Sequence, residues 1–346
     1  MGLPEHFSEL NAVVSTEHYS RRLAEQIYIA LCKQWVPSFE EITTLPKGLR
    51  QELATAFPDF FPATVEVTSS RDCRKLLLRL SDGELIETVI LSNPKGEATV
   101  CVSSQAGCPL NCVFCATGAE GFRRNLTHWE IAYQAFAAAA IARADGARLT
   151  NVVVMGMGEP FLNFDNVVQA LRLLNDPNGL ALGARKISVS TGGMLKGIHA
   201  FAKLPEQFNL AISLHSPFNE ERRRLMPVSK GYKVGELVRE ATGYVQKTGR
   251  KLFFEYLLLR DVNTSPEHMK ALALLLKHPL FHINLISYNT GAGDFKGLNT
   301  TEAHAIAAQL VRLGAKVTVR RSMGRGINAA CGQLRATRAG EPAKCG

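Results

Sequence analysis

From residue 98 onward, short runs rich in β-branched and apolar residues alternate with longer segments of helical periodicity. The runs predict six strands, at 98–103, 151–155, 186–190, 209–214, 251–258 and 282–287, with a further candidate at 316–320. The intervening segments predict helices at 127–144, 166–174, 234–248, 266–278 and 301–313. Six strand–helix units in series predict an α/β fold with a parallel sheet and right-handed crossovers. Because eight units close a full barrel, we expect an open, partial (β/α)6 barrel with its chemistry at the carboxyl ends of the strands.

The first 95 residues follow a different pattern. Charged and apolar residues alternate at helical spacing from Glu17 to about Phe57, and Pro46 opens a second helix there. Two β-rich runs, at 76–82 and 85–91, then flank an Asp-Gly turn and predict a β-hairpin. We therefore expect a helical accessory domain at 1–75, a β-hairpin linker at 76–97, the partial barrel at 98–320 and a flexible C-terminal segment carrying Cys331 at 321–346.

The composition is that of a globular protein, with 46% hydrophobic and 21% charged residues, and it excludes a disordered chain. The longest apolar stretch, 132–142, has 11 residues and contains Tyr133 and Gln134, so it is too short to cross a bilayer. No basic segment followed by an apolar run opens the chain. We therefore expect a cytoplasmic protein with no signal peptide and no membrane partner.

Positive charge is concentrated in the second half of the chain. Residues 1–150 hold 14 Lys and Arg against 17 Asp and Glu, residues 151–315 hold 19 against 13, and residues 316–346 hold 7 against 1. Nine of the basic residues lie between Arg222 and Lys251. Such a skew is typical of a protein that binds a polyanion. A solubilising surface explains it equally well.

Three of the eight cysteines, Cys108, Cys112 and Cys115, have a C-x3-C-x2-C spacing directly after the first predicted barrel strand. Clustered cysteines in a cytoplasmic chain indicate metal or redox chemistry rather than disulfides, and thiolates favour zinc or an iron–sulfur cluster. A [4Fe–4S] cluster with three cysteine ligands leaves one iron open to a substrate-like ligand, whereas a closed zinc site needs a fourth ligand such as a distant His. The spacing alone leaves both interpretations open.

Other polar segments follow the later predicted strands. They are Gly156-Met-Gly-Glu-Pro160, Ser190-Thr-Gly-Gly193, Ser213-Leu-His215 and, just beyond the sixth strand, Asn289. The carboxyl ends of the strands of a parallel barrel meet at one face. We therefore expect these segments to form one site with the three cysteines.

The cysteine triplet on the loop after a first barrel strand resembles the radical S-adenosylmethionine superfamily. In that superfamily the open iron of a [4Fe–4S] cluster binds S-adenosylmethionine, which is then cleaved to a 5′-deoxyadenosyl radical. Longer segments resemble the RlmN/Cfr family of 23S ribosomal RNA adenine methyltransferases, and this resemblance covers nearly the whole chain. These segments are Cys101-Val-Ser-Ser-Gln-Ala-Gly-Cys108, Cys115-Ala-Thr-Gly118, Met155-Gly-Met-Gly-Glu-Pro160, Ser213-Leu-His215 and Ala329-Ala-Cys-Gly-Gln-Leu334.

The resemblance implies a role for each matching residue. The cluster ligands would be Cys108, Cys112 and Cys115. The residues lining the S-adenosylmethionine site would be Gly158, Glu159, Ser190, Ser213, Leu214, His215 and Asn289. Cys331 would carry the methyl group, Cys101 would be its resolving partner, and Glu87 would accept the ring proton.

In the implied reaction, one S-adenosylmethionine methylates the Cys331 thiolate, and a radical from a second takes a hydrogen atom from that methyl group. The carbon radical adds to the adenine ring, and the ring proton passes to a base. Cys101 then attacks the sulfur of Cys331, which releases methylated RNA and leaves a transient disulfide. The accessory domain is a candidate RNA contact, and basic residues would contact the RNA phosphates. These basic residues are Arg222, Arg223, Arg224, Lys230, Arg320, Arg321, Arg325, Arg335 and Arg338.

The matching segments are divided between two branches of the family. Residues 215–222 and 225–227 are closer to the Cfr branch, which methylates C8, whereas 158–160 and 162–163 are closer to the RlmN branch, which methylates C2. Gly192-Gly193 and Arg325-Gly326 depart from both. We favour C2.

The implied partners are 23S ribosomal RNA and an electron donor such as flavodoxin, for a monomeric chain, and transfer RNA is an open second substrate. Two other classes of protein stay open. One is a radical S-adenosylmethionine enzyme that acts on a protein or a small molecule. The other is a non-enzymatic RNA-binding protein that contains zinc.

Overall fold

The structure is a computed structural model that describes residues 10, 21–289, 293–321 and 323–334. Its main sheet has ten strands in the order β1-β2-β3-β4-β7-β8-β9-β10-β11-β12. From β4 onward the neighbours are parallel. These strands are β4 (Glu97–Val102), β7 (Arg148–Val154), β8 (Ile187–Thr191), β9 (Asn209–Ser213), β10 (Leu252–Leu258), β11 (Phe281–Ser287) and β12 (Val317–Arg320). The six expected parallel strands are confirmed, and the candidate at 316–320 forms β12 beside β11.

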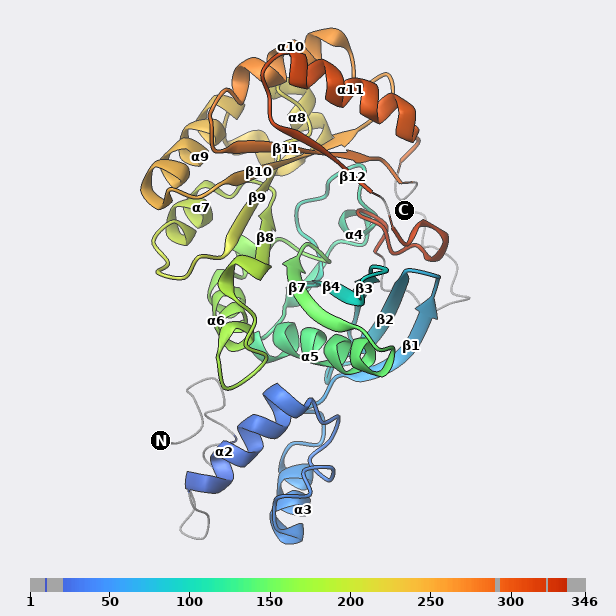
Figure 1. The fold of residues 1–346 in the computed structure, drawn as a ribbon, viewed down its shortest axis with the longest axis vertical. Helices are drawn as coiled ribbons and strands as arrows, with labels where there is room; N and C mark the ends of the chain where they lie inside the picture. The colour runs from blue at the N-terminus through green and yellow to red at the C-terminus, as the bar shows by residue number, and fades with distance from the viewer. Residues whose placement is uncertain (1–9, 11–20, 290–292, 322, 335–346) are drawn as a thin grey trace.

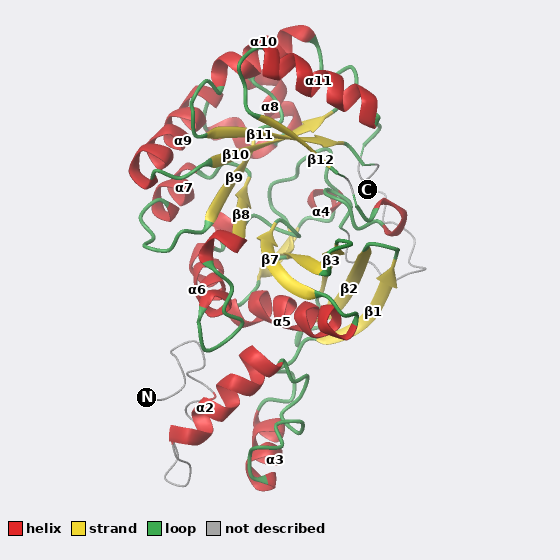
Figure 2. Cartoon of the chain, viewed as in Figure 1, coloured by secondary structure: helices red, strands yellow, loops and turns green. Residues whose placement is uncertain are grey.

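Helices connect the parallel strands and lie along the outer side of the curved sheet (Figure 1, Figure 2). They are α5 (His128–Ala144), α6 (Phe164–Asn175), α7 (Leu195–Phe201), α9 (Val234–Thr248), α10 (Pro266–Leu275) and α11 (Thr300–Arg312). All of these except α7 were expected, and the capping box of Thr127 and Glu130 forms at the start of α5. The inner side is left to the loop after β4 and its short helix α4 (Ala116–Ala119) (Figure 1). The strand ends therefore face the loop after β4.

The hydrophobic core lies between the sheet and the outer helices. Alternate residues of β10, including Phe254 and Tyr256, are fully buried. Helix α5 is apolar nearly all round because the sheet covers one side and α6 packs beside it. At its start Trp129 stacks on Phe60, with the ring centroids 4.7 Å apart, and its indole N–H donates to the Phe60 carbonyl at 2.8 Å. The N-terminal region is thereby joined to the helices that cover the parallel sheet.

The N-terminal region is helical only as far as α3. Helix α2 (Arg21–Ile29) passes into a π-helical turn at Ala30–Gln34, and α3 (Lys47–Ala56) follows directly after Pro46. The expectation of a helical region up to residue 75 is wrong in its last part, because Ala63–Ser69 forms strand β1. Residues 17–20 of the expected helix lie outside the described residues.

The expected hairpin forms from β2 (Cys73–Arg79) and β3 (Leu85–Ser92), and β1 pairs with β2. It is not a linker, because β3 pairs antiparallel with β4 and extends the main sheet, with Val89 opposite Cys101. The physical reason is burial. Residues such as Leu78 and Ile90 pack in the same core as α5, whereas a linker would leave them in water. Among the described residues, no helix is long and apolar enough to span a membrane.

Candidate active site

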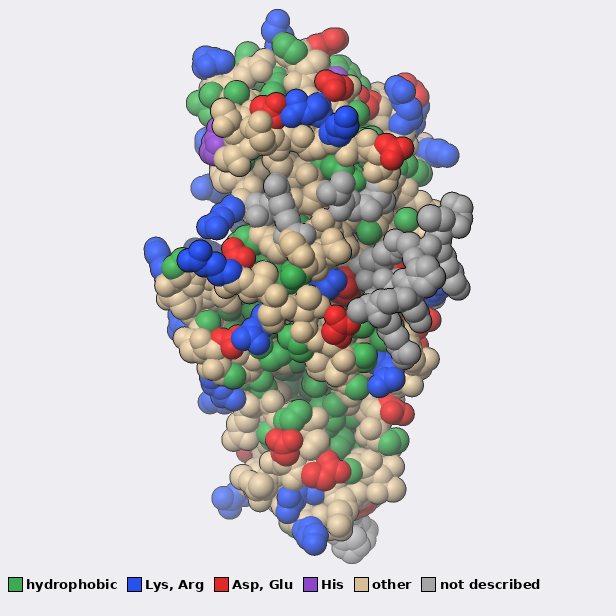
Figure 3. Space-filling view, turned by 90° about the vertical axis from the view of Figure 1, so that its right-hand side faces the viewer, with side chains coloured by type: hydrophobic (Ala, Val, Ile, Leu, Met, Phe, Trp, Pro, Cys, Tyr) green, Lys and Arg blue, Asp and Glu red, His purple; other side chains and the backbone are tan. Residues whose placement is uncertain are grey.

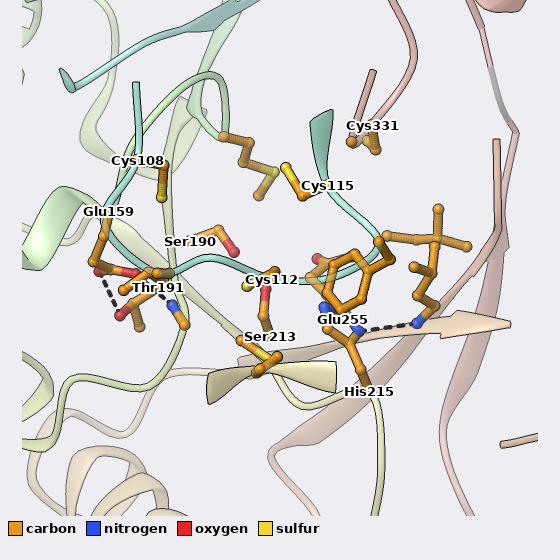
Figure 4. A pocket seen from close by; sticks show the side chains of 18 of the residues that line it. Cys108, Cys112, Cys115, Glu159, Ser190, Thr191, Ser213, His215, Glu255 and Cys331 are labelled. Atoms are coloured by element: carbon orange, nitrogen blue, oxygen red, sulfur yellow. Dashed lines mark hydrogen bonds between the residues drawn. The ribbon is translucent and has the colours of Figure 1, made fainter. Parts of the chain in front are cut away.

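One pocket lies where the parallel strands end, and it collects most of the predicted site residues (Figure 4). It is lined by Cys108, Cys112, Cys115, Gly158, Glu159, Ser190, Thr191, Ser213, His215, Glu255 and Cys331, among others. Leu214 and Asn289, which were predicted for the same site, do not line this pocket. The side chain of Leu214 is fully buried in the core instead.

The three clustered cysteines lie on a tight loop, residues 108–115, which we call the cluster loop. The Cys115 N–H donates to the Cys112 carbonyl at 3.0 Å, and Asn111 takes a left-handed conformation with φ 51°. A small sheet of β5 (Gln105–Gly107) and β6 (Phe122–Asn125) brackets the loop. As a result the three sulfur atoms face a common space (Figure 4).

These thiols lie in a low-dielectric environment. Burial raises the pKa of the Cys108 thiol to about 12. The pKa of Cys112 is raised as well, first by burial and then by the charges of Cys115 and Cys108. Several thiolates therefore cannot coexist here without a cation. A bound metal centre would replace their protons.

The arrangement of the thiols fits a cluster better than a single ion. Among the described residues, no three His, Cys, Asp or Glu side chains come close enough together to bind one metal ion. In a [4Fe–4S] cluster each thiolate binds a different iron, which suits three soft donors spread around one space. Three donors leave one iron open to a further ligand.

Glu159 is the most firmly held side chain of the pocket. Its Oε1 accepts from the Phe161 N–H at 2.9 Å and from the Thr191 hydroxyl at 2.7 Å, and its Oε2 accepts from the Gly192 N–H at 2.6 Å. Burial raises its pKa, whereas these hydrogen bonds lower it. A Cβ on Gly192 would lie 2.6 Å from Leu110 Cδ1 and 3.2 Å from Glu159 Oε2, so a side chain at this position would require Leu110 to shift. Glu159 thereby ties the end of β7 to the end of β8.

His215 lines the pocket as a neutral imidazole. Burial lowers its pKa to about 3, and the nearby Arg222 cation lowers it as well. Nδ1 accepts a hydrogen bond from the Leu257 N–H at 3.1 Å, which places the ring hydrogen on Nε2. The ring meets Phe114 edge-on, with centroids 4.9 Å apart. The residue is thus fixed against the cluster loop.

Arg222 does not reach solvent, and the prediction that it contacts RNA phosphates is wrong. It is 1% exposed, and its guanidinium donates to the carbonyls of Gly192 at 2.8 Å, Ser213 at 3.1 Å and Leu214 at 3.1 Å. It also lies over the ring of Tyr232. Arg222 therefore fastens the ends of β8 and β9 beneath the pocket. It belongs to α8 (Asn219–Leu225), where Arg224 is exposed and Arg223 pairs with Glu220.

A second pocket adjoins the first, and Cys331 and Arg320 line both. It also contains Cys101 and Asn289, so the two predicted partner thiols are brought to one cavity. Asn289 is 5% exposed, and neither its amide nitrogen nor its amide oxygen has a hydrogen-bond partner in the structure. A buried amide of this kind indicates a ligand in the neighbouring space.

The segment 323–334, which we call the C-terminal loop, carries Cys331 to the mouth of these pockets. The residue is exposed as a whole, yet its thiol faces inward, where burial raises its pKa and Arg320 lowers it. Burial raises the pKa of Cys101 to about 12. Both thiols are free, so the predicted disulfide is not formed in this structure.

The C-terminal loop is docked on α4, which directly follows the cluster loop. The Ala116 N–H donates to the Gly332 carbonyl at 2.9 Å, and the Thr117 hydroxyl donates to the Leu334 carbonyl at 2.7 Å. Thr117 is buried. The position of Cys331 is therefore coupled to the loop that carries the cluster cysteines.

Glu87 lines neither pocket. It is 2% exposed on β3, and its Oε1 lies 2.7 Å from the Lys75 Nζ on β2. Its strand is the one that pairs with the strand of Cys101. The structure thus places it near the resolving thiol, though not in contact with the pocket space.

Sequence reasoning missed Glu255 and misplaced Arg320. Glu255 lies 3.3 Å from the Arg320 guanidinium and accepts from the Asn284 side chain at 2.9 Å. Arg320 therefore lies in the pocket wall rather than on an RNA-facing surface. A single acidic residue inside the apolar run 252–259 was the signal that could have revealed Glu255.

The surface does not show one continuous basic patch on the face drawn in Figure 3. Over the part of that face that is not grey, Lys and Arg are scattered among Asp and Glu. Arg224, Lys230 and Arg321 are exposed among the predicted phosphate contacts. Arg335, Arg338 and the side chain of Arg325 lie outside the described part of the chain.

Comparison with known proteins gives a consistent picture. The model of the radical SAM superfamily matches residues 102–273. A protein of Dictyoglomus thermophilum named probable dual-specificity RNA methyltransferase RlmN is 42% identical over 314 residues, which are 90% of each chain. A protein of Nitrosopumilus maritimus named ribosomal RNA large subunit methyltransferase N is 39% identical and covers 96% of this chain and 97% of its own.

A solved structure matches the fold over nearly its whole length. The crystal structure of a radical SAM methyltransferase from Sphaerobacter thermophilus superimposes with a TM-score of 0.92 at 40% identity, covering 97% of this chain and 98% of that one. The parallel sheet, the cluster loop and the flanking N-terminal region therefore belong to an arrangement already seen in a related enzyme.

Proposed function

The chain belongs to the RlmN family of radical S-adenosylmethionine enzymes, and from this we propose that it methylates C2 of an adenine in 23S ribosomal RNA through an S-methylated Cys331. One observation carries the proposal. Cys331 lines both the pocket that holds the three cluster cysteines and the adjoining pocket that holds Cys101. A methyl-carrying thiol needs both neighbours, the radical source on one side and the resolving thiol on the other.

Cys108, Cys112 and Cys115 would hold a [4Fe–4S] cluster, and S-adenosylmethionine would occupy its open position. Together these groups supply one-electron reductive cleavage when bound. Glu159 has three of its roughly four acceptor positions used by the chain, which leaves about one for the amino group of the ligand. The other residues assigned to the ligand are Gly158, Ser190, Ser213, Leu214, His215 and Asn289, of which Leu214 contributes through its backbone position.

The thiols and Glu87 then perform the chain's own part of the reaction. The Cys331 thiolate attacks the sulfonium methyl group, so that an S–C bond forms as the donor's S–C bond breaks. After the methylene carbon is joined to the ring, one electron of the joined species would return to the bound cluster, and Glu87 takes the ring proton. The Cys101 thiolate attacks the Cys331 sulfur, so that an S–S bond forms, the bond from that sulfur to the methylene carbon breaks, and this carbon takes up a proton to become the methyl group. An external reductant restores the two thiols.

The proposed reaction also requires a defined domain arrangement, an electron donor and access for the RNA. We assign the parallel sheet as a partial (β/α)6 barrel, with the helices α2 and α3 as the accessory region and the C-terminal loop, 323–334, as the moving segment. Flavodoxin is the proposed class of electron donor, transfer RNA is a proposed second substrate, and a monomer in the cytoplasm is the proposed form. A target base would have to leave its stack to reach the buried thiols.

Mapping the methylated base tests the proposal. The reconstituted enzyme, S-adenosylmethionine, a reductant and a 23S ribosomal RNA transcript should yield 2-methyladenosine on digestion and mass spectrometry. The Cys331→Ala variant should retain its iron content and form none. Formation of 8-methyladenosine would contradict the assignment to C2. Unmodified RNA alongside S-methylated Cys331 would favour a different substrate, and a colourless, iron-free protein would favour the zinc alternative.

A further inference from the structure

A buried ion pair lies beside the second pocket and is not explained by cluster binding or by the two thiols. The Lys75 Nζ on β2 lies 2.7 Å from the Glu87 Oε1 on β3. The Lys75 side chain is 16% exposed and that of Glu87 is 2% exposed. Replacing a buried pair by apolar residues is often neutral or stabilising, so such a pair is weak evidence of a purely structural role.

Strand register places this pair on the pocket side of the sheet. Lys75 lies opposite Val89, and Val89 lies opposite Cys101. Directly paired residues point to the same face, and so do residues two apart along a strand, so Glu87 shares that face with Val89. Val89 and Cys101 both line the second pocket with Cys331. Glu87 is therefore two residues along β3 from Val89, which lines the pocket where the ring would be joined to Cys331.

The backbone around Glu87 is fixed. The Ser103 hydroxyl donates to the Glu87 carbonyl at 2.7 Å, and the Glu87 N–H meets the Met157 Sδ at 3.4 Å. Ser103 and Met157 are themselves almost fully buried. The Glu87 side chain therefore starts from a fixed point on β3, and its carboxylate lies against Lys75.

We propose that Lys75 is a positioning residue, which holds the Glu87 carboxylate in its charged form and in the orientation that accepts the proton of the target ring. This inference rests on the function proposed above. A cation within hydrogen-bond distance favours the ionised form of a carboxylate and limits its rotation. Lys75 lines neither pocket, so we expect it to act through Glu87.

The order of steps separates this role from a structural one. Methylation of Cys331 precedes proton loss, whereas release of the joined RNA follows it. In Lys75→Met, Cys331 should be S-methylated to the wild-type extent, measured by mass spectrometry of the isolated peptide. The covalent protein–RNA species should accumulate on denaturing gels, and product release should slow by about tenfold to a hundredfold, within the range for losing general-base efficiency.

Three further variants sharpen the test. Lys75→Arg keeps the charge and should recover release to within about threefold of wild type. Arg79→Met removes an exposed cation from the same strand and should change neither readout. In a Glu87→Gln background, Lys75→Met should slow release by less than about twofold more, because a residue that acts through Glu87 has nothing left to position.

The outcomes distinguish this inference from the proposed function. Cys101→Ala should trap the same covalent species, and its failure to do so would overturn the proposed function itself. If Cys101→Ala traps the species while Lys75→Met releases RNA normally, Lys75 has no positioning role. Equal loss of Cys331 methylation and of release in both Lys75→Met and Lys75→Arg would also overturn the inference, since it would indicate general damage to the fold.

Discussion

The two walls of the active site are built in opposite ways. The strand-end wall is bonded from several sides, with Glu159 accepting three hydrogen bonds and Arg222 donating to three carbonyls. The C-terminal loop that faces it is bonded to α4 through two hydrogen bonds, from Ala116 and Thr117. One wall is part of the sheet, and the other rests against it.

This difference matches what the proposed reaction requires of each wall. A site that orients a cluster and a charged cofactor gains from groups that do not reorganise during the reaction. A thiol that accepts a methyl group at one place and delivers it at another has to move, which requires attachments weak enough to break. The fixed wall therefore carries the binding residues, and the docked loop carries Cys331.

We expect the largest change in the free energy of unfolding when Arg222 of the strand-end wall is replaced. Arg222→Met would remove three hydrogen bonds donated by a buried cation, although the Gly192 carbonyl keeps the Tyr232 hydroxyl and the Leu214 carbonyl keeps the Ser216 N–H. Hydrogen bonds to charged groups contribute more than neutral ones, so we expect a loss of about 3 kcal/mol in the free energy of unfolding. Urea denaturation of the cluster-free protein measures it. Arg224→Met, an exposed neighbour on the same helix, should change it by less than about 0.5 kcal/mol. A loss below about 1 kcal/mol for Arg222→Met would show that the wall does not depend on this residue.

The next effect concerns pH and again tests the fixed wall. His215 has a pKa of about 3 in the folded protein because of burial and of Arg222, whereas an unfolded histidine titrates near 6.5. Between these values the unfolded chain binds more protons, so stability is complete above about pH 6.5 and falls as the pH drops toward 3. At pH 5 this histidine alone should lower the free energy of unfolding by about 2 kcal/mol relative to pH 7.5.

Asparagine at this position provides the comparison. His215 has φ 60°, a conformation that asparagine tolerates, and an asparagine carbonyl can accept a hydrogen bond as Nδ1 does. His215→Asn should therefore lose that part of the pH dependence in urea titrations of cluster-free protein. An unchanged slope between pH 7.5 and pH 5 would mean that other groups dominate.

A smaller effect is expected on the docked loop. Thr117→Val removes the hydroxyl that donates to the Leu334 carbonyl, at a cost of about 1 kcal/mol to docking, which corresponds to about fivefold more time undocked. Iodoacetamide should label Cys331 about fivefold faster, while labelling of Cys101 stays unchanged. Thr117→Ser keeps the donor and should behave as wild type. A fall in global stability without faster labelling would place Thr117 in the fixed wall instead.

Local patterns were sufficient to predict the parallel strands and the cluster loop, because strand periodicity and cysteine spacing are short-range signals. Orientation was harder to predict. The three consecutive arginines of α8 look alike in sequence, yet a turn of about 100° per residue sends Arg222 into the core and leaves Arg224 outside. Apolar and polar residues alternate along β1, as in a strand with one buried face. Val65 and Val67 are nevertheless exposed at the edge of the sheet, so this alternation does not reflect burial in the core.

Long-range contacts could not be predicted from the sequence. Asn289 follows the strand end as predicted, but which pocket it lines depends on how the C-terminal loop returns across the sheet. The pairing of Glu255 with Arg320 joins residues 65 positions apart. The prediction for Glu87 came from resemblance alone, and its partner Lys75 became apparent only through the register of β2 and β3.

We expect the smallest change in stability when the exposed Arg224 or Lys230 is replaced, together with a measurable change in RNA binding. Arg224 and Lys230 are exposed beside the buried Arg222. If each neutralises one phosphate, Arg224→Met and Lys230→Met should each reduce the slope of log affinity against log salt by about 1, with less than about 0.5 kcal/mol change in unfolding. Filter binding with a 23S ribosomal RNA fragment at several salt concentrations measures the slope. A slope that stays the same in both variants would assign these charges to solvation, and would leave the phosphate contacts to other cations of the chain.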